Sequence, residues 1–455
     1  MSTISRIAQT LCLCLLPAMP LTAQNNGGGN GGNNQQNTGG IIINGEGVVQ
    51  TTPQRRISPA QLKKLQQQFT ASYLSEELIE SSPARVLSLK QLDQAVKEAL
   101  DSGKPLPEPL KYLAGIQRID VVRIDQANHD ILIIGPAEGF GPDPSGQIVG
   151  ASTGRPPMKL DDLVVALRAT FAGETDLGVS IDPTPENLAN LQNYVRTNTG
   201  VTSTANAQQR LRNMARILGN QVISLWGVPE ESHFALALVE ADLRMKRIAL
   251  GLDPSGVRRV TSHLTLLRPQ GNSLQRWWFM PYYEPIATNA DRTMFEIKGQ
   301  RAQLMAQEEI SDVKGERTNS AFTRQTTEKF AENFTEHFEE LAAQNVAFAE
   351  LQNLYDHALL AALAKQNWPF PNRATGLDTL LNDERLPVNS FVVPKFVPSA
   401  STNKLAGGVL LGLVGGVTID VDDIARKPEP KLQGPVDKFD AKDQSNQWWW
   451  IPKGD

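Results

Sequence analysis

The stretch from Gln221 to Gly251 constrains the fold more than any other part of the chain. It begins with a short apolar run of the kind found in buried strands, and Gly227 and Pro229 end that run. In the longer segment that follows, apolar residues recur at steps of three and four, as on one face of a helix: Phe234, Leu238, Ala241, Met245 and Ile248. We therefore expect a buried strand, a tight turn and a helix that begins at Pro229 and ends at Gly251.

The segments around this unit predict an α+β fold of mixed helices and β-hairpins. Helical patterns occupy Leu87–Leu100, Leu160–Phe171, Ala205–Leu218 and Thr326–Gln366, the last either continuous or broken near Asn345, and further helices are expected to open at Ser58 and Thr184. Alternating apolar residues predict hairpins over Ile116–Ile134 and Trp277–Gly299. The two hairpin patterns are alike, which leaves open an internal duplication or a chance similarity.

Shifts in composition along the 455 residues suggest the following organisation. In order, we expect a signal peptide (1–23), an Asn/Gly-rich disordered linker (24–40), a helical N-terminal region (41–115), an α/β core region (116–310), a helical region (324–367), a glycine-rich strand region (386–424) and an irregular tail that ends in tryptophans (425–455).

The first 23 residues have the pattern of a secretory signal peptide. Arg6 is the only charge, an apolar stretch follows, and Ala23 offers a small residue before the cleavage point. We expect an exported protein, periplasmic or extracellular, without a transmembrane segment in the mature chain; a retained anchor helix is the alternative. Both cysteines, Cys12 and Cys14, lie inside this segment, so the mature chain would have no disulfide and no thiol nucleophile.

Overall charge argues against one class of partner. The formal net charge is −5, whereas a nucleic-acid-binding surface needs a basic patch, so nucleic acid is not an expected partner. Apolar residues make up 40% of the chain, an ordinary share that is enough for a sizeable core.

Only weak candidates for catalysis can be named, and these are His233, Asp242, Asp420 and Asp422. His233 follows Glu230 at the spacing of di-iron helices, but a second such pair is missing, so neither a metal nor a cofactor is expected. Asp420 and Asp422 would share one face of a strand and could act as acid and base or hold calcium. The more ordinary interpretation is a helix start and a solvated strand end.

A glycine-rich stretch over residues 135–157 carries two basic side chains at or near its end. Arg155 and Lys159 could bind an anion there, although the stretch lacks the lysine and the glycine spacing of nucleotide-binding loops. The alternative is an ordinary connecting loop.

Aromatic and acidic side chains are the candidates for interaction. Trp448, Trp449 and Trp450 are expected to be partly exposed, whereas Trp226 should lie in the core. Trp277, Trp278, Tyr282 and Tyr283 could stack on sugar rings if exposed, or fill the core. Four glutamates at steps of four predict an acidic ridge along one continuous helix: Glu328, Glu332, Glu336 and Glu340. Three interpretations of this ridge are open. It is a solvated face, it docks on a basic surface such as Arg244, Lys246 and Arg247 or on a cationic partner, or it binds divalent cations.

Several short motifs occur together in a fixed order. They include Gly135-Pro136-Ala137-Glu138-Gly139, Thr153-Gly154-Arg155-Pro156, Asp182-Pro183-Thr184 and Trp226-Gly227-Val228-Pro229. Over residues 110–365 the chain resembles an uncharacterised family of secreted proteins known mainly from planctomycete bacteria. The resemblance implies a location outside the cytoplasm, but it assigns no functional residue.

Taken together, these patterns favour a non-catalytic structural or interaction protein of the cell envelope. Its partner is unknown, with an envelope protein or a polysaccharide as the options. The alternative is a hydrolase-like enzyme that uses Asp, Glu and His. A pocket in which two of the four catalytic candidates converge would favour the enzyme, and solvated carboxylates would favour the interaction protein.

Overall fold

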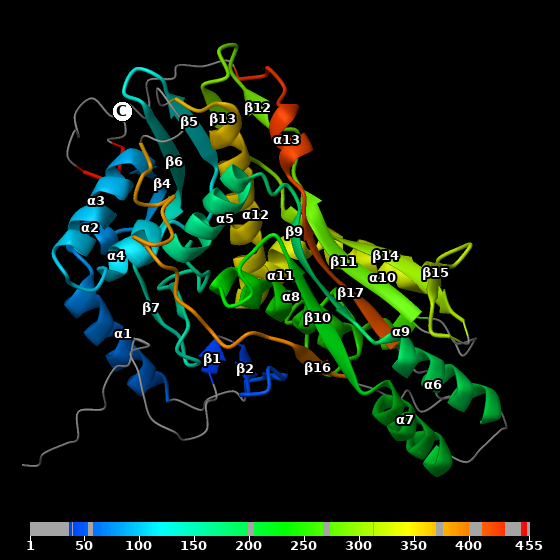
Figure 1. Ribbon diagram of the computed structural model, residues 1–455. Helices are drawn as coiled ribbons and strands as arrows, with labels where there is room; N and C mark the ends of the chain where they lie inside the picture. Colours follow the sequence, from blue (N-terminus) through cyan, green and yellow to red (C-terminus); the bar gives the residue numbers. More distant parts are fainter. Residues whose placement is uncertain are drawn as a thin grey trace, which may run out of the picture. The chain divides into compact units, whose positions relative to one another are not determined.

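The fold is α+β, as the sequence predicts, and its helices and strands alternate along most of the chain (Figure 1). The computed structural model describes residues 36–38, 40–52, 58–198, 204–266, 274–312, 314–369, 376–399, 412–432 and 447–452. The expected signal peptide and most of the expected linker lie outside these residues. Residues 36–38, at the end of that linker, form a strand.

The helices are the following: α1 (Pro59–Tyr73), α2 (Glu76–Ile79), α3 (Leu89–Asp101), α4 (Glu108–Lys111), α5 (Leu160–Ala172), α6 (Pro185–Thr197), α7 (Thr204–Leu218), α8 (His233–Ala249), α9 (His263–Leu266), α10 (Gln325–Glu336), α11 (Phe338–Gln344), α12 (Val346–Gln366) and α13 (Asp422–Arg426). A 3-10 turn occupies Leu113–Gly115.

In the described residues the strands form two main sheets. The large sheet has the order β15 (Arg317–Asn319), β14 (Arg301–Ser311), β11 (Leu274–Tyr282), β17 (Gly412–Ile419), β9 (Leu177–Asp182), β10 (Asn220–Trp226) and β16 (Phe396–Pro398). The second sheet has the order β12 (Ala287–Thr288), β13 (Met294–Glu296), β5 (Val121–Asp125), β6 (Asp130–Ala137), β4 (Ser82–Ser88) and β18 (Trp449–Trp450). Two small sheets join β1 (Gln36–Thr38), β2 (Ile41–Ile43) and β3 (Val49–Thr51), and β7 (Phe140–Pro142) with β8 (Ile148–Gly150).

The central strand and helix form as expected, but the helix begins later. β10 covers the apolar run, whereas α8 starts at His233 because the Ser232 side chain caps it by accepting the Ala235 N–H. Pro229 and Glu230 therefore lie in the turn before the cap rather than in the first helical turn. Gly251 follows the last turn with φ +66°, the left-handed conformation that ends helices.

The predicted hairpin over Trp277–Gly299 is wrong. β11 pairs with β14 and β17 in the large sheet, whereas β13 pairs with β5 and β12 in the second sheet. Pro285 lacks the N–H needed to continue a ladder, and the chain leaves the large sheet between β11 and β12. The likeness of the two hairpin patterns thus gives no support for a duplication, since only β5 and β6 form a hairpin of the expected kind.

The long helical pattern at Thr326–Gln366 contains three helices rather than one or two. The expected break at Asn345 separates α11 from α12, and a second break at His337 separates α10 from α11. The glutamate ridge is therefore interrupted: Glu340 lies beyond that second break.

α12 runs between the two sheets and connects them (Figure 1). Asp356 of this helix is fully buried. Its carboxylate accepts a hydrogen bond at 2.9 Å from the N–H of Ile119, two residues before β5 of the second sheet. It also pairs at 3.1 Å with Arg301 of β14 in the large sheet. The Tyr283 hydroxyl donates to the same carboxylate at 3.0 Å. One buried carboxylate thus joins segments that lead into both sheets.

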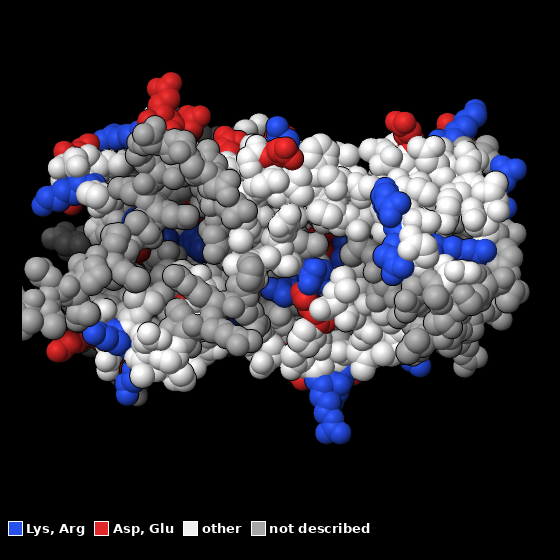
Figure 2. All heavy atoms as spheres, turned by 90° about the horizontal axis from the view of Figure 1, so that it is seen from below, with Lys and Arg blue, Asp and Glu red and all other residues white. Residues whose placement is uncertain are grey.

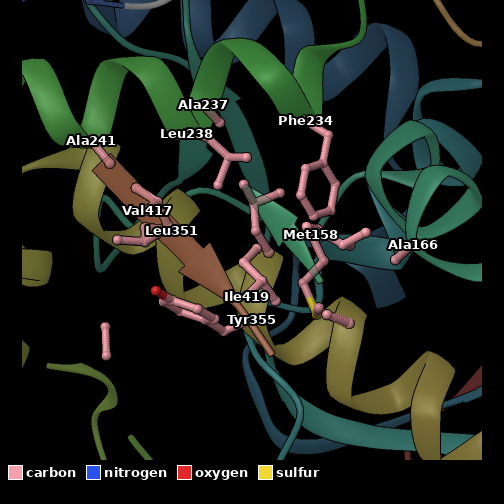
Figure 3. Packing of buried hydrophobic residues seen from close by; sticks show 14 of the residues in the cluster. Met158, Ala166, Phe234, Ala237, Leu238, Ala241, Leu351, Tyr355, Val417 and Ile419 are labelled. Atoms are coloured by element: carbon pink, nitrogen blue, oxygen red, sulfur yellow. The ribbon is translucent and has the colours of Figure 1, made fainter. Parts of the chain in front are cut away.

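The main apolar core lies where α8 and α12 meet the large sheet. Figure 3 shows Phe234 and Leu238 of α8 close to Val417 and Ile419 of β17, with Tyr355 of α12 on their other side. A ring cluster extends this core under α10 and α11: Trp277, Phe279, Phe330, Phe334, Phe338 and Phe348. All of these side chains are buried.

The expected irregular tail ends in a short strand. β18 pairs with β4, and Trp450 is buried against Val86, Leu132 and Ile134. Trp449 is half-buried and lies under the guanidinium of Arg85, 5.0 Å from its ring centre. None of the three consecutive tryptophans is therefore fully exposed, because alternate side chains of a strand point to opposite faces and can pack against different neighbours.

Candidate functional site

His233 lies in a buried polar cluster formed by the starts of α5 and α8 and by Glu350 in the second turn of α12. Its Nδ1 is 3.0 Å from the Asp162 carboxylate, and its Nε2 is 2.6 Å from the Lys159 amine. The amine also pairs with Glu350 at 2.5 Å. Lys159 and Asp162 belong to the start of α5, His233 opens α8 and Glu350 lies near the start of α12.

A helix start and a paired lysine explain why carboxylates are stable here. The amino end of a helix carries a partial positive charge, so the start of α5 favours the Asp162 carboxylate, whereas Glu350 lies beyond the first turn of α12 and is paired with Lys159 instead. Burial would raise the pKa of Asp162, but the charge and hydrogen bond of His233 outweigh burial, and the pKa lies below its usual value. For His233, burial opposes protonation, yet the Asp162 charge prevails and raises its pKa.

The cluster contains part of a catalytic triad but not its nucleophile. An Asp–His pair orients the ring as in hydrolases, in which a serine or cysteine faces the other ring nitrogen. That position is taken by the Lys159 amine, and the close contact holds only one proton between the two nitrogens. All four side chains are therefore engaged with one another.

The other three catalytic candidates lie elsewhere. Asp242 is buried on α8 and pairs with Lys246 at 2.7 Å, and Lys246 also donates to the Ile181 carbonyl. β17 ends at Ile419, so Asp420 and Asp422 do not share a strand face as expected. Asp420 is exposed, and Asp422 opens α13, where it pairs with Arg426. The four candidates do not share one pocket in these contacts.

The two basic residues of the glycine-rich stretch are also paired within the chain. Arg155 hydrogen-bonds Gln352 and pairs with Glu339 at 3.5 Å, and Lys159 belongs to the cluster above. Glu138 holds the turn before them by accepting the Ser152 and Thr153 N–H groups, both at 3.0 Å. Both basic side chains thus contact acceptors of the chain itself, Gln352 and Glu339 for Arg155 and Glu350 for Lys159, in place of the anion that was one option for this stretch.

Among the described residues, no group of three or more His, Cys, Asp or Glu side chains is arranged to hold a metal ion. The same residues include no helix with the length and apolar character needed to cross a bilayer.

A different candidate site lies on the face of the large sheet that points away from α8 and α12. On the covered face, Val179, Trp277 and Val417 are fully buried. Alternate residues of these strands and of β10 point the other way: Ser180, Thr418, Trp226 and Trp278 are half-buried there, Ser224 is exposed, and the glycines Gly178 and Gly416 are buried. Trp226, expected in the core, is therefore on the outer face.

Strand register places small hydroxyl and glycine residues between the two tryptophans. Ser224, Ser180, Gly416 and Trp278 form one row across β10, β9, β17 and β11, and the next row runs from Trp226 through Gly178 to Thr418. β10 and β11 are three strand spacings apart, about 14 Å. We call this strip of small residues between the two tryptophans the outer trough; it consists of Gly178, Ser180, Gly416 and Thr418.

Both rings at the sides of the outer trough are held in place. The Trp226 ring lies directly over Gly178, because a Cβ built on that glycine would be 2.4 Å from ring atom Cζ2. The Arg276 guanidinium stacks on Trp278, 4.8 Å from its ring centre, and Arg276 pairs in turn with Glu309. The Trp226 ring therefore covers Gly178, and Ser180, Gly416 and Thr418 lie between that ring and Trp278.

Sequence patterns predicted only part of this site. Trp278 was among the aromatic residues that could stack on sugar rings if exposed, but Trp226 was expected in the core because it ends a mostly apolar run. The floor depends on β17, which lies far along the chain from β9, and its register was not predictable from either strand alone.

One comparison with known proteins gave a match. Residues 179–263 match the family model described as "Protein of unknown function (DUF1598)". This stretch contains most of β9, all of β10 and α8, and therefore Trp226 and His233. No curated protein and no solved structure matched the chain.

Proposed function

We propose that this protein is an exported, non-catalytic glycan-binding protein of the cell envelope. The outer trough carries the proposal, because Trp226 and Trp278 lie on either side of the hydroxyl groups of Ser180 and Thr418, with the exposed Ser224 beside Trp226 on β10. Aromatic rings stack on the apolar faces of sugars, and side-chain hydroxyls exchange hydrogen bonds with theirs. The floor of the trough bears no charge, which favours a neutral polysaccharide. The N-terminal pattern with Arg6 and Ala23 supports export.

Affinity electrophoresis tests the glycan proposal. The purified protein is run through native gels that contain cellulose derivatives, soluble β-glucan, chitin derivatives or neutral polysaccharide extracted from the host envelope. We expect retardation by at least one of them and a loss of about tenfold in affinity, roughly 1.4 kcal/mol, in Trp278→Ala and in Trp226→Ala.

Tyr73→Ala is the matched control, since Tyr73 is an exposed aromatic residue on α1, far along the chain from the trough. Mobility that is unaffected by every polysaccharide, or equal losses in all three variants, would refute the glycan proposal. Export has its own test: the N-terminal sequence of the envelope fraction should begin at Gln24, and a retained Met1 would point to an anchor instead.

The Asp162–His233 pair keeps a hydrolase as the second candidate. If the cluster only ties helices together, Asp162→Asn should lower the free energy of unfolding by about 3–5 kcal/mol, because it leaves buried cationic groups without their partner. Residues kept for catalysis often behave oppositely, and their removal stabilises the protein. Urea unfolding distinguishes the two, and a stabilised Asp162→Asn would support the enzyme.

A further inference from the structure

α7 presents arginines without acidic neighbours on its own helix. Thr204–Leu218 contains three arginines and no Asp or Glu. Arg212 and Arg216 are exposed one helical turn apart, and neither forms an ion pair with another described residue; Arg212 bonds only to the neutral Gln209. Arg196 on the adjoining α6 is exposed as well. Figure 2 shows Lys and Arg atoms gathered at the end of the molecule formed by α6 and α7.

α10 presents the opposite charge at the same spacing. Glu328, Glu332 and Glu336 are exposed at successive steps of four residues, and within the described part of the chain they form no ion pairs. Lys329 lies beside them and leaves a net charge of about −2 on this face. The helix tolerates the repulsion because its other side packs Phe330 and Phe334 into the ring cluster.

The basic surface first expected to meet this ridge is already occupied. Arg244 and Arg247 both pair with Asp253 at 2.8 Å, and Lys246 is buried against Asp242. The ridge therefore does not dock on these three residues. Two unpaired and complementary faces remain on different parts of one chain.

We propose that the α7 arginine face of one copy binds the α10 glutamate face of a second copy. Arg212 and Arg216 are four residues apart, as are Glu332 and Glu336, so two helices laid side by side bring both pairs into register at a rise of about 6 Å. Arg196 and Glu328 extend the charged faces. Arginine suits this role, because its planar fork bonds both oxygens of a carboxylate.

The geometry of this contact determines the kind of assembly. The two faces are different surfaces of the chain, so each copy keeps one free face after pairing, and the contact is head-to-tail rather than two-fold symmetric. A contact between two helix faces buries less than the roughly 1,200 Å² of a stable interface, so association is weak, reversible and sensitive to salt.

Sedimentation velocity of the purified protein at low and high salt tests the proposal. The Debye length is about 20 Å at about 20 mM NaCl and about 4 Å at about 500 mM NaCl, so the higher salt concentration screens the attraction between the two faces. The average sedimentation coefficient should rise with protein concentration at low salt and stay at the monomer value at high salt. The double variants Arg212→Glu with Arg216→Glu, and Glu332→Arg with Glu336→Arg, should each stay monomeric at low salt.

An equimolar mixture of the two reversed variants should associate again, because each then offers the charge that the other needs. The control is Lys63→Glu with Lys64→Glu on α1, which changes the net charge as much as the arginine variant and should associate like the wild type. A wild-type monomer under both conditions, or reversed variants that still associate, would overturn the proposal. If a reversed variant does not fold by circular dichroism, Arg→Gln and Glu→Gln variants replace it.

This inference goes beyond the proposed glycan function and does not rest on it, and the two tests fail separately. Glycan retardation depends on Trp226 and Trp278, which the reversed variants leave intact. Self-association without glycan binding would refute only the function proposed above.

Discussion

Glu240 shows how one buried carboxyl group ties the N-terminal strands to the central helix. Its side chain is buried on α8 and accepts the N–H of Gly40, which lies so close that a Cβ on that glycine would be 2.0 Å from Oε1. Burial first, and the charge of Glu350 second, raise the pKa of Glu240 to about 8, against the opposing effect of Arg244. A glycine is therefore required at position 40, and the carboxyl group is largely protonated at neutral pH.

Stability should depend on pH through this residue. Between the unfolded pKa near 4.5 and the folded value of about 8, the folded chain holds a proton that the unfolded chain has released, so the free energy of unfolding falls as pH rises. The slope is at most about 1.4 kcal/mol per pH unit. Glu240→Gln keeps the acceptor for Gly40 but does not titrate, so its advantage over the wild type in urea unfolding should grow from pH 5 to pH 8. Parallel pH curves for the two proteins would contradict this prediction.

The burial of polar residues such as Glu240 could not be predicted from sequence patterns. Glu240 and Asp242 sit among apolar residues of α8, and their partners come from different distances along the chain: Lys246 lies one helical turn from Asp242, whereas Gly40 lies 200 residues before Glu240. A hydrophobic stripe predicts which face of a helix is covered, but it does not predict which polar side chains are covered with it.

Among the elements, β18 and β10 show the opposite tryptophan burial to that expected from the sequence. Trp450 is 5% exposed and packs on Val86 and Ile134, whereas Trp226 is half-exposed in the outer trough. Apolar content alone suggested the reverse, since Trp226 lies in an apolar run and Trp450 follows a polar tail. Trp450 is buried because β18 pairs with β4. A strand of two residues is too short to be predicted from an alternating sequence pattern.

Trp450→Ala should therefore cost more than Trp226→Ala. Removal of a buried tryptophan typically costs about 3–5 kcal/mol, and a half-exposed ring should cost clearly less. Urea unfolding followed by circular dichroism compares the two variants with the wild type. The opposite order of stabilities would mean that β18 is only loosely attached to β4.

At the scale of the molecule, one compact unit covers Gln35–Asp455. The sheets take strands from distant stretches, so that β4, β5, β13 and β18 share one sheet. The α+β class and several helices could be predicted because their periodicity is local. The sheet order could not, since it depends on pairing between segments hundreds of residues apart.

The two sheets should unfold in one transition. α12 is buried along most of its length, and Asp356 binds Ile119 and Arg301 on either side of it, so neither sheet keeps its core when the other is lost. Differential scanning calorimetry should give a calorimetric enthalpy equal to the van't Hoff enthalpy. Two resolved peaks, or a ratio well above one, would show that the sheets melt independently.

The helix starts of α5 and α8 at His233 have a consequence for how new binding could arise. Helix amino ends commonly hold phosphate or sulfate in other proteins, and here Asp162 takes the place of such a ligand at the start of α5. A variant without the Asp162 carboxylate would keep the two helix starts and the Lys159 amine but lose the group that now occupies them. Room for a small inorganic anion would then require the loss of Glu350 as well, because its carboxylate contacts the same amine.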